Sequence, residues 1–400
     1  IAHTRNHQWN HAVGEILTAL LGAGLVATPV GAAPVWSGLD AANYAGPIPA
    51  KGGEQIRSVP LDPALSLPGA GTAKRVLYST TDQHGKPATS TGAIFLPKGT
   101  APAGGWPVIA WAHGTVGLGD TCAPSANPRS ARDREYLGHW LSQGYAIVAS
   151  DYAGLGTPGL MSYLNSVSTA HNVVDSVVAA HRDRSLNLST KWAIVGQSQG
   201  GGAAVNSARW ATQFSAGSGL DYRGVVATGT PFKIEEVVKN VGPDTGLPGG
   251  LSSAATSYTA YILAGVREAN PGVDFEKVLT PRGKAAAAQA EVQCYAQLST
   301  TLAGQKPTDF VNAKVSTVPG ASAALDRYMG TPTSGYDRPV FLGVGLKDTD
   351  VPVQSSIALA AALKKSGTAV ELHQYPNADH SGAVLESMKD STPFLARVLA

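Results

Sequence analysis

The chain has 400 residues, of which 43% are hydrophobic and only 14% are charged. That length can bury a sizeable core, in one large domain with an insertion or in two smaller domains, and the hydrophobic content excludes disorder over most of it. The formal net charge is +2 and no run of Lys or Arg occurs, so the composition gives no electrostatic basis for binding nucleic acid or acidic lipid.

The first part of the chain is typical of a secretory signal peptide. Residues 12–33 form an apolar stretch that follows a weakly basic segment and ends in small residues. The uninterrupted apolar run after Glu15 is short for a membrane span, and Val30-Gly31-Ala32 suits a cleavage site. We therefore expect a signal peptide at 1–32 and a secreted, extracellular protein; an uncleaved anchor is the alternative.

Strands and helices are expected to alternate after a Pro/Gly-rich, irregular arm at 34–70. Two short extended runs, Arg75–Thr80 and Ser90–Leu96, flank a turn sequence and predict a hairpin. Buried strands of a parallel sheet are predicted over Pro107–Ala112, Tyr145–Ala149, Lys191–Val195, Arg223–Thr228, Pro339–Val344 and Ala369–Tyr375. Helices are predicted over 166–182, 200–212, 353–365 and 383–399. This alternation predicts a doubly wound α/β fold with a mostly parallel sheet flanked by helices.

The helix predicted over 166–182 has an amphipathic pattern. Four valines between 173 and 178 fall on one stripe, with Asn172, Asp175 and Ser176 on the opposite side. The pattern predicts that the valines face the core.

Residues 231–336 break the alternation. They hold few strand signals, and Pro/Gly segments at 242–250 and 330–339 bracket mostly helical sequence, including an Ala-rich helix predicted over 284–298. We interpret 231–336 as a cap inserted over a core that comprises 33–230 and 337–400. Within it, Leu247–Val266 is either a mobile apolar flap, suited to a lipid–water interface or a polyester surface, or a rigid wall. Tyr258 and Tyr261 are candidate pocket-lining residues.

The strongest local signal is the pentapeptide GQSQG at 196–200. A serine hydroxyl is a weak nucleophile unless it is exposed beside a base, and a sharp strand-to-helix turn exposes it only if tiny residues stand two before and two after it. Here the motif follows a predicted buried strand and opens a predicted helix of small residues. We therefore predict Ser198 as a nucleophile.

A base and an acid should follow the serine, in loops after later strands. His380 lies just past the strand Ala369–Tyr375, whereas the rival His373 lies inside that strand, and no other histidine follows Ser198. Asp348 and Asp350 both follow the strand Pro339–Val344, and their positions alone do not separate them. His380 is predicted as the base and one of the two aspartates as its partner.

An oxyanion hole needs backbone N–H donors near the nucleophile. One is predicted at Gln199, directly after the serine, and the other in the loop after Ala112, at Gly114 or Thr115. His113 is expected to shape that loop. In the next loop, Asp151 is expected to be structural and Tyr152 is a candidate for pocket lining.

The chain has two cysteines, Cys122 and Cys294. An even pair in an exported protein favours a disulfide, with two buried free thiols as the alternative. No Cys/His cluster has the spacing of a zinc site, and we expect neither a metal nor an organic cofactor.

Several segments together resemble the actinobacterial secretory lipases related to Candida antarctica lipase A. They are AHGTVGLGDTCAPS (112–125), SDYAGLG (150–156), GQSQGG (196–201), DTDVP (348–352) and the pair Asp379-His380. The resemblance implies an α/β-hydrolase fold with a helical cap between nucleophile and acid, an acid at Asp348, and a Cys122–Cys294 bond into the cap. The oxyanion loop departs from the fungal member, because this chain has His113-Gly114-Thr115 where that enzyme has an acidic residue.

These patterns predict a secreted serine hydrolase of carboxylic esters, a lipase or esterase that forms an acyl-enzyme on Ser198. Its substrate is expected to be a small-molecule or lipid ester, and the chain is expected to be a monomer. The same three residues would also serve an acyltransferase with an alcohol or sugar acceptor. A non-catalytic binding protein on a hydrolase scaffold is the third hypothesis, and the complete set Ser198, Asp348 and His380 argues against it.

Overall fold

The structure is a computed structural model that describes residues 32–245 and 248–400. The predicted signal peptide therefore lies, apart from Ala32, outside the described residues. Gly246 and Leu247, at the start of the predicted flap, also lie outside them.

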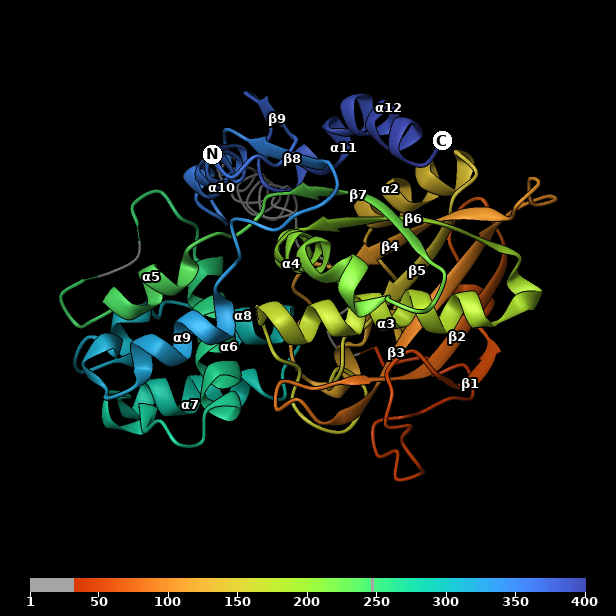
Figure 1. The fold of residues 1–400 in the computed structure, drawn as a ribbon. Helices are drawn as coiled ribbons and strands as arrows, with labels where there is room; N and C mark the ends of the chain where they lie inside the picture. The colour runs from red at the N-terminus through yellow and green to blue at the C-terminus, as the bar shows by residue number, and fades with distance from the viewer. Residues whose placement is uncertain (1–31, 246–247) are drawn as a thin grey trace, which may run out of the picture.

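A nine-stranded mixed sheet forms the centre of the fold, in the order β1-β2-β3-β5-β4-β6-β7-β8-β9 (Figure 1). Its strands are β1 Gln55–Pro60, β2 Ala70–Thr81, β3 Pro87–Pro97, β4 Trp106–Ala112, β5 Ala146–Ser150, β6 Leu188–Gln197, β7 Asp221–Thr228, β8 Val340–Gly345 and β9 Val370–Tyr375. In the order of the sheet, neighbouring strands from β1 through β3 to β5 pair antiparallel, and neighbouring strands from β5 through β4 to β9 pair parallel. The predicted α/β fold class is confirmed.

One strand was not expected from the sequence. The arm at 34–70 contains β1, which pairs with β2 at the edge of the sheet. Its side chains are half-buried or exposed, so β1 lacks the apolar run that marks the central strands. The pairing with β2, rather than the composition of β1, makes this segment a strand.

Helices cover both faces of the sheet. Helices α3 (Ser166–Arg182), α4 (Gln199–Phe214) and α10 (Val353–Lys365) pack on one face, and α2 (Ala131–Ser142), α11 (Gly382–Glu386) and α12 (Met388–Val398) pack on the other. Along β4 the side chains alternate between the two cores: Val108 and Ala110 belong to the first, and Ile109 and Trp111 to the second. The helix predicted over 383–399 is thus two helices, α11 and α12, which meet at Ser387.

The polar side of α3 is not exposed to solvent. Asn172, Asp175 and Ser176 are as buried as the valines opposite them. Asn172 Nδ2 donates to Thr80 Oγ1 at 3.0 Å, and Thr80 Oγ1 donates to Asp175 Oδ2 at 2.8 Å. The helix therefore packs against a polar patch of β2, and the amphipathic pattern marks two buried faces of different polarity.

Residues between β7 and β8 form a helical region that Figure 1 shows gathered on the left, away from β1–β3. Its helices are α5 Ile234–Asn240, α6 Ala254–Ala269, α7 Pro281–Ala290, α8 Tyr295–Thr301 and α9 Ala321–Met329. The Ala-rich helix predicted over 284–298 is two helices, α7 and α8, because residues 291–294 are not helical. Among the described residues, no helix is both long and apolar enough to cross a bilayer.

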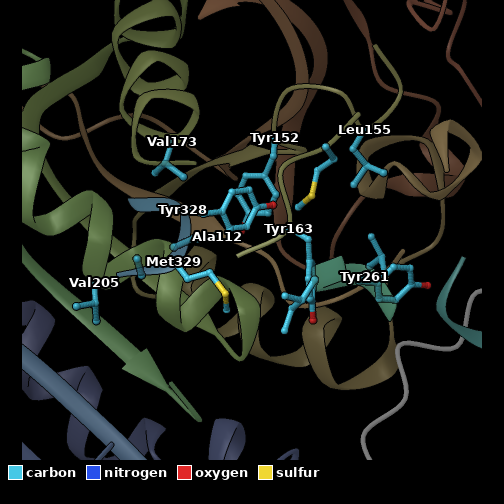
Figure 2. Packing of buried hydrophobic residues seen from close by; sticks show 14 of the residues in the cluster. Ala112, Tyr152, Leu155, Tyr163, Val173, Val205, Tyr261, Tyr328 and Met329 are labelled. Carbon is cyan, nitrogen blue, oxygen red and sulfur yellow. The ribbon is translucent and has the colours of Figure 1, made fainter. Parts of the chain in front are cut away.

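The helical region shares one core with the sheet. A single cluster of buried side chains contains Ala112 from β4, Val205 from α4, Tyr261 from α6 and Tyr328 from α9 (Figure 2). Most of α6 is buried, from Ala255 to Val266. This half of the predicted flap is therefore a packed wall.

Candidate active site

Ser198 stands in a strained turn between β6 and α4. Its backbone has φ 58° and ψ −123°, a conformation that non-glycine residues rarely adopt and that is found mostly at functional sites. Ser198 N–H donates to Thr228 O at 2.9 Å, which fixes the turn to the end of β7. The side chain is 7% exposed.

The two glycines of the pentapeptide are required by close backbone contacts. A Cβ on Gly196 would collide with the carbonyl oxygen of Gly200. A Cβ on Gly200 would collide with the carbonyl oxygens of Ala112 and His113, at the end of β4. The motif therefore lets α4 start directly against the neighbouring strand, and this holds Ser198 at the carboxyl edge of the sheet.

His380 and Asp348 meet beside this turn. His380 Nδ1 lies 2.6 Å from Asp348 Oδ2, and the carboxylate side chain is 1% exposed. Asp348 Oδ1 accepts hydrogen bonds from the backbone N–H groups of Asp350 and Val351, at 2.9 and 3.0 Å. A carboxylate only accepts, so Nδ1 carries the proton and Nε2 of a neutral ring is free to accept one.

The structure separates the two candidate acids. Asp350 Oδ1 accepts from Ser252 Oγ at 2.7 Å, so this side chain faces the helical region and not His380. His373, the rival histidine, lies in β9, where it stacks on Phe341 with its Nε2 3.2 Å from Glu371 Oε2. Asp350 lines the cleft beside Ser198, but the carboxylate that contacts His380 is that of Asp348.

An apolar cleft opens beside Ser198. Its walls come from both parts of the molecule, with Gln199 and Val351 on the sheet side and Tyr258 and Ile262 on α6. Leu251, Val237, Val238 and Ile234 add further apolar surface. The cleft can hold a hydrophobic group with one end at the serine hydroxyl.

The loop after β4 passes next to the serine. Gly114 lies against the elbow, since a Cβ added there would stand 3.6 Å from Ser198 Cβ. Thr115 Oγ1 is hydrogen-bonded to Tyr163 OH at 2.7 Å. Gln199 is the first residue of α4, so its N–H has no partner within the helix. Gln199 and Gly114 thus adjoin Ser198, whereas Thr115 is joined to Tyr163, a residue of the cleft wall.

His113 and Asp151 hold this loop in place. The ring nitrogens of His113 lie 2.7 Å from Gly114 O and 3.1 Å from Asp151 O. Burial lowers the pKa of the ring, and the contacts with these carbonyl groups oppose that shift. Asp151 is fully buried, forms an ion pair with Arg75, and accepts from Thr91 Oγ1 at 2.8 Å. Both residues are structural in this fold.

Two of the three candidate pocket tyrosines do not line the cleft. Tyr152 is fully buried and donates from its hydroxyl to His113 O at 2.8 Å, so it supports the loop from behind. Tyr261 is also fully buried and donates to Gln293 O at 3.2 Å. Of the three candidates, Tyr258 lines the cleft, as does Tyr163. Neighbouring positions of α6 have different environments because the helix is buried on several sides.

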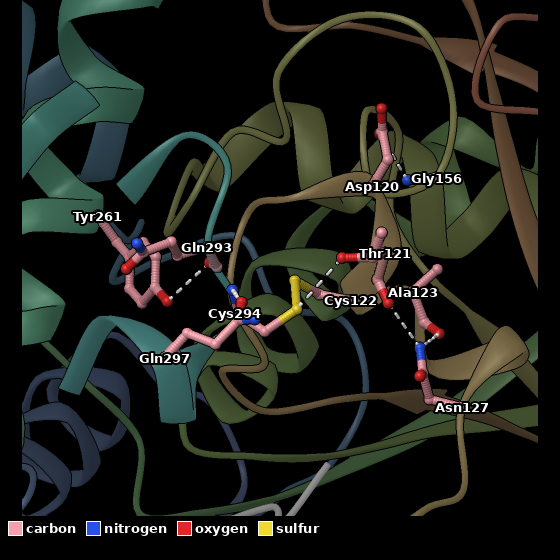
Figure 3. The surroundings of a disulfide bond; sticks show 10 residues. All are labelled: Asp120, Thr121, Cys122, Ala123, Asn127, Gly156, Tyr261, Gln293, Cys294 and Gln297. Carbon is pink, nitrogen blue, oxygen red and sulfur yellow. Dashed lines mark hydrogen bonds between the residues drawn. A yellow bond between two sulfur atoms is a disulfide. The ribbon is translucent and has the colours of Figure 1, made fainter. Parts of the chain in front are cut away.

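A disulfide joins Cys122 to Cys294, with their Cα atoms 5.4 Å apart (Figure 3). It links the loop after β4 to the start of α8, and Tyr295 N–H donates to Val116 O at 2.9 Å beside it. A Cβ on Gly117, whose φ is 114°, would stand 2.6 Å from Cys294 Cα. The helical region is therefore attached to the loop that carries Gly114 and Thr115.

Two residues of the site were not identified from the sequence. Gln197 Nε2 lies 3.2 Å from His380 Nε2, and Arg132 on α2 donates to Gln197 Oε1 at 3.1 Å. Gln197 occupies a variable position of the pentapeptide, so the motif treats it as a spacer. Arg132 lies 65 positions away in the chain, and nothing in its local sequence marks it.

In the part of the chain that the structure describes, one acidic group could share a metal ion: Glu235, Glu236 and Asp326. Lys239 Nζ already lies 2.7 Å from Glu236 and 2.6 Å from Asp326. An internal cation therefore satisfies two of the three carboxylates.

Comparison with known proteins gives the same architecture. The model of the prolyl oligopeptidase family matches residues 317–400, the stretch that carries Asp348 and His380. Candida antarctica lipase A in its closed state is 19% identical, with a TM-score of 0.68 over 88% of this chain and 83% of that one. The rice cell wall degrading esterase LipA from Xanthomonas oryzae is 18% identical, with a TM-score of 0.70 over 88% of this chain and 99% of that one. A search of curated proteins finds no match.

The chain has the α/β-hydrolase fold. The resemblance to the relatives of Candida antarctica lipase A is confirmed at the level of the fold. In this fold, Ser198 follows β6, Asp348 follows β8 and His380 follows β9, all at the carboxyl edge of parallel strands. Loops at that edge are where such sheets bind ligands.

Proposed function

We propose that the chain is a secreted serine hydrolase of carboxylic esters, with Ser198 as nucleophile, His380 as base and Asp348 as its partner. The observation that carries the proposal is the 2.6 Å contact between Asp348 and His380 beside a serine in strained backbone, where an apolar cleft opens. A binding protein needs neither the strained serine nor the buried carboxylate.

The reaction follows from these positions. Ser198 Oγ attacks the ester carbonyl carbon while its proton passes to His380 Nε2, and Asp348 stabilises the imidazolium that forms. The tetrahedral oxyanion is held by the N–H of Gln199 and by that of Gly114 or Thr115. The intermediate collapses, the C–O bond to the alcohol breaks, and the alcohol leaves with the proton of His380. Water then repeats the sequence on the acyl-enzyme and releases the acid.

The apolar cleft points to the acyl part of the substrate. Its walls bear Leu251, Ile234 and Ile262, which favour a hydrocarbon chain over a charged or sugar-like group. Residues 231–336 act as a cap in this proposal, because α5 and α6 supply those walls. A small-molecule or lipid ester therefore fits the site, and two similar structures, a lipase and an esterase, support the same class.

The extracellular setting rests on the N-terminal pattern and on the disulfide. Disulfides persist in oxidising compartments. We propose that the mature chain begins after Ala32, within one residue. N-terminal sequencing of the protein from a culture supernatant checks this, and retention of residues 1–32 on secreted protein would contradict it.

The deciding experiment is a substrate profile with a nucleophile variant. We expect hydrolysis of p-nitrophenyl esters across a series of acyl lengths, and a loss of about 10⁴–10⁶-fold in kcat for Ser198→Ala. Ser142→Ala, which removes an exposed hydroxyl on α2, is the matched control and should keep full activity. A fluorophosphonate probe should label Ser198 alone.

The same assays separate the alternatives. Faster cleavage of peptide p-nitroanilides than of esters would replace the esterase by a peptidase. Transfer of the acyl group to an added alcohol or sugar in preference to water would make the chain an acyltransferase. Equal activity of Ser198→Ala and the wild type would refute the nucleophile, and the absence of all turnover and labelling would leave a binding protein.

A further inference from the structure

The proposed base, His380, contacts a side chain other than that of Ser198. His380 Nε2, the atom that must take the proton of Ser198, lies 3.2 Å from the side-chain amide nitrogen of Gln197. Among the hydrogen bonds of the described residues, none joins Ser198 Oγ to His380. The neutral ring has one acceptor nitrogen, so Gln197 and Ser198 compete for the same lone pair.

Arg132 determines which end of the Gln197 amide faces the histidine. A guanidinium only donates, and Arg132 Nη2 donates to Gln197 Oε1 at 3.1 Å. The amide NH₂ is thereby turned toward His380. Because an N–H group must meet an acceptor, His380 Nε2 has to be unprotonated in this arrangement, with its proton on Nδ1 toward Asp348.

The Arg132 side chain is itself held in position, with 11% of it exposed. Its Nε donates to Asp133 Oδ1 at 2.9 Å, and its Nη1 donates to Ser381 Oγ at 3.1 Å, next to the histidine. Gln197 is 3% exposed and packs against Gly114, since a Cβ there would stand 2.7 Å from Gln197 Oε1. The amide therefore has little room to turn over.

We propose that Gln197 is a positioning residue that keeps His380 neutral and correctly oriented in the resting enzyme, and that Arg132 acts through it. A protonated Nε2 would point its hydrogen at the Gln197 N–H, so the arrangement disfavours the imidazolium, which cannot act as a base. When substrate is bound, Ser198 Oγ–H replaces the amide at Nε2, an exchange of one hydrogen bond for another. This role rests on the proposed function, because it assigns His380 as the base.

Several charged groups lie near the His380 ring. Asp348 contacts Nδ1, Arg132 lies behind Gln197, and Asp133 neutralises Arg132. Asp379 precedes the histidine and accepts from Gly382 N–H, and Asp350 follows on the loop of Asp348. The variants below leave all four carboxylates in place.

The test replaces the donor by an acceptor of the same shape. Gln197→Glu keeps the contact with Arg132 but presents a carboxylate to His380, which stabilises the imidazolium. We expect the acidic limb of kcat/KM against pH to move up by about one unit, so that activity falls about tenfold near pH 6 and stays close to that of the wild type near pH 9. Arg134→Met, on the same helix but bonded to Ser66 O, is the control and should leave the limb in place.

A second variant shows whether Arg132 works through the amide. Arg132→Met should move the limb in the same direction, because a released amide can present its carbonyl to a protonated Nε2. In the Gln197→Met background, Arg132→Met should cause no further shift of the acidic limb. A shift that persists there would mean that Arg132 acts by its charge alone and would overturn its assignment to Gln197. If Gln197→Glu fails to fold, this pair of variants carries the whole test.

Titration of ¹⁵N-histidine by NMR gives a readout that does not depend on turnover. The His380 midpoint should rise in Gln197→Glu by the same amount as the kinetic limb. A folded Gln197→Glu with an unmoved limb and midpoint, or with a loss of activity equal at all pH values, would overturn the proposal. An inactive wild type that no fluorophosphonate labels would instead refute the proposed function.

Discussion

The two sides of the candidate site are held in different ways. On the sheet side, Ser198, Asp348 and His380 follow neighbouring parallel strands, and backbone contacts at Gly196 and Gly200 leave the turn no freedom. On the other side, α5 and α6 form a wall that belongs to the helical region, which is attached by the disulfide at the start of α8 and by side-chain contacts between distant parts of the chain. The chemistry thus depends on main-chain geometry, whereas the shape of the cleft depends on contacts that can change without displacing the reacting groups.

The two aspartates after β8 give the largest expected contrast between these sides. Asp348→Asn should lower kcat by about 10³–10⁴-fold, because an amide cannot hold the ring with its proton on Nδ1 as a carboxylate does. Asp350→Asn, whose partner Ser252 belongs to the helical region, should change kcat by less than about tenfold. Steady-state kinetics on one soluble ester measures both. A larger loss at Asp350 would reverse the assignment of the acid.

Glycine substitutions compare the packing of the two regions. Gly200→Ala should prevent folding or lower the free energy of unfolding by more than about 4 kcal/mol, because the new Cβ meets two carbonyl oxygens at the end of β4. Gly272→Ala, in the helical region, has nothing within 4 Å of the added atom and should stay within about 1 kcal/mol. Urea unfolding followed by circular dichroism measures the difference. Equal stability of the two variants would contradict the steric account of the elbow.

Removal of the disulfide tests how far the wall can loosen while the reacting groups stay in place. The double variant Cys122→Ser with Cys294→Ser should lose about 2–5 kcal/mol of unfolding free energy, because the bond closes a span of 172 positions. The kcat on a short soluble ester should remain within about threefold, since the bond holds none of Ser198, Asp348 and His380, and Gly114 also packs against Gln197 and Ser198. A loss of kcat as large as that of Asp348→Asn in a folded protein would show that the two sides are not independent.

A polar contact at the antiparallel side of the sheet gives the last contrast, and its effect depends on pH. Burial raises the pKa of Asp175 to about 7, and the hydrogen bond from Thr80 opposes this rise. The folded state thus binds this proton more tightly than the unfolded chain, whose value is near 3.8. The stabilisation is complete below about pH 4 and is lost as pH rises to about 7, by an amount on the order of 4 kcal/mol.

Asp175→Asn should remove that slope and make the protein more stable than the wild type near pH 8. Thermal unfolding between about pH 5 and pH 8 measures it. The same slope in both proteins would mean that the carboxyl group is hydrated in the folded state.

Much of the sheet side could be predicted from local patterns. The parallel strands are buried on both faces, so their apolar runs mark them, and α3 has the predicted bounds. Local patterns did not predict the structure where contacts with another element, rather than the composition of the segment, decide it. The edge strand β1 exists through its pairing with β2, and the polar residues of α3 are buried because β2 offers them Thr80. The break between α7 and α8, at the residue that reaches Cys122, also has no local signal.

The sequence by itself determined the fold class, the strained serine and the histidine that follows the last strand, because each depends on short-range geometry that a few residues encode. The family resemblance implied Asp348, but only the tertiary structure brought it rather than Asp350 against His380. The tertiary structure also buried Tyr152 and Tyr261 away from the cleft and placed Gln197 against the base, with Arg132 bonded to Gln197. These outcomes depend on which side chains meet across distant elements. Packing decides that, and no local pattern records it.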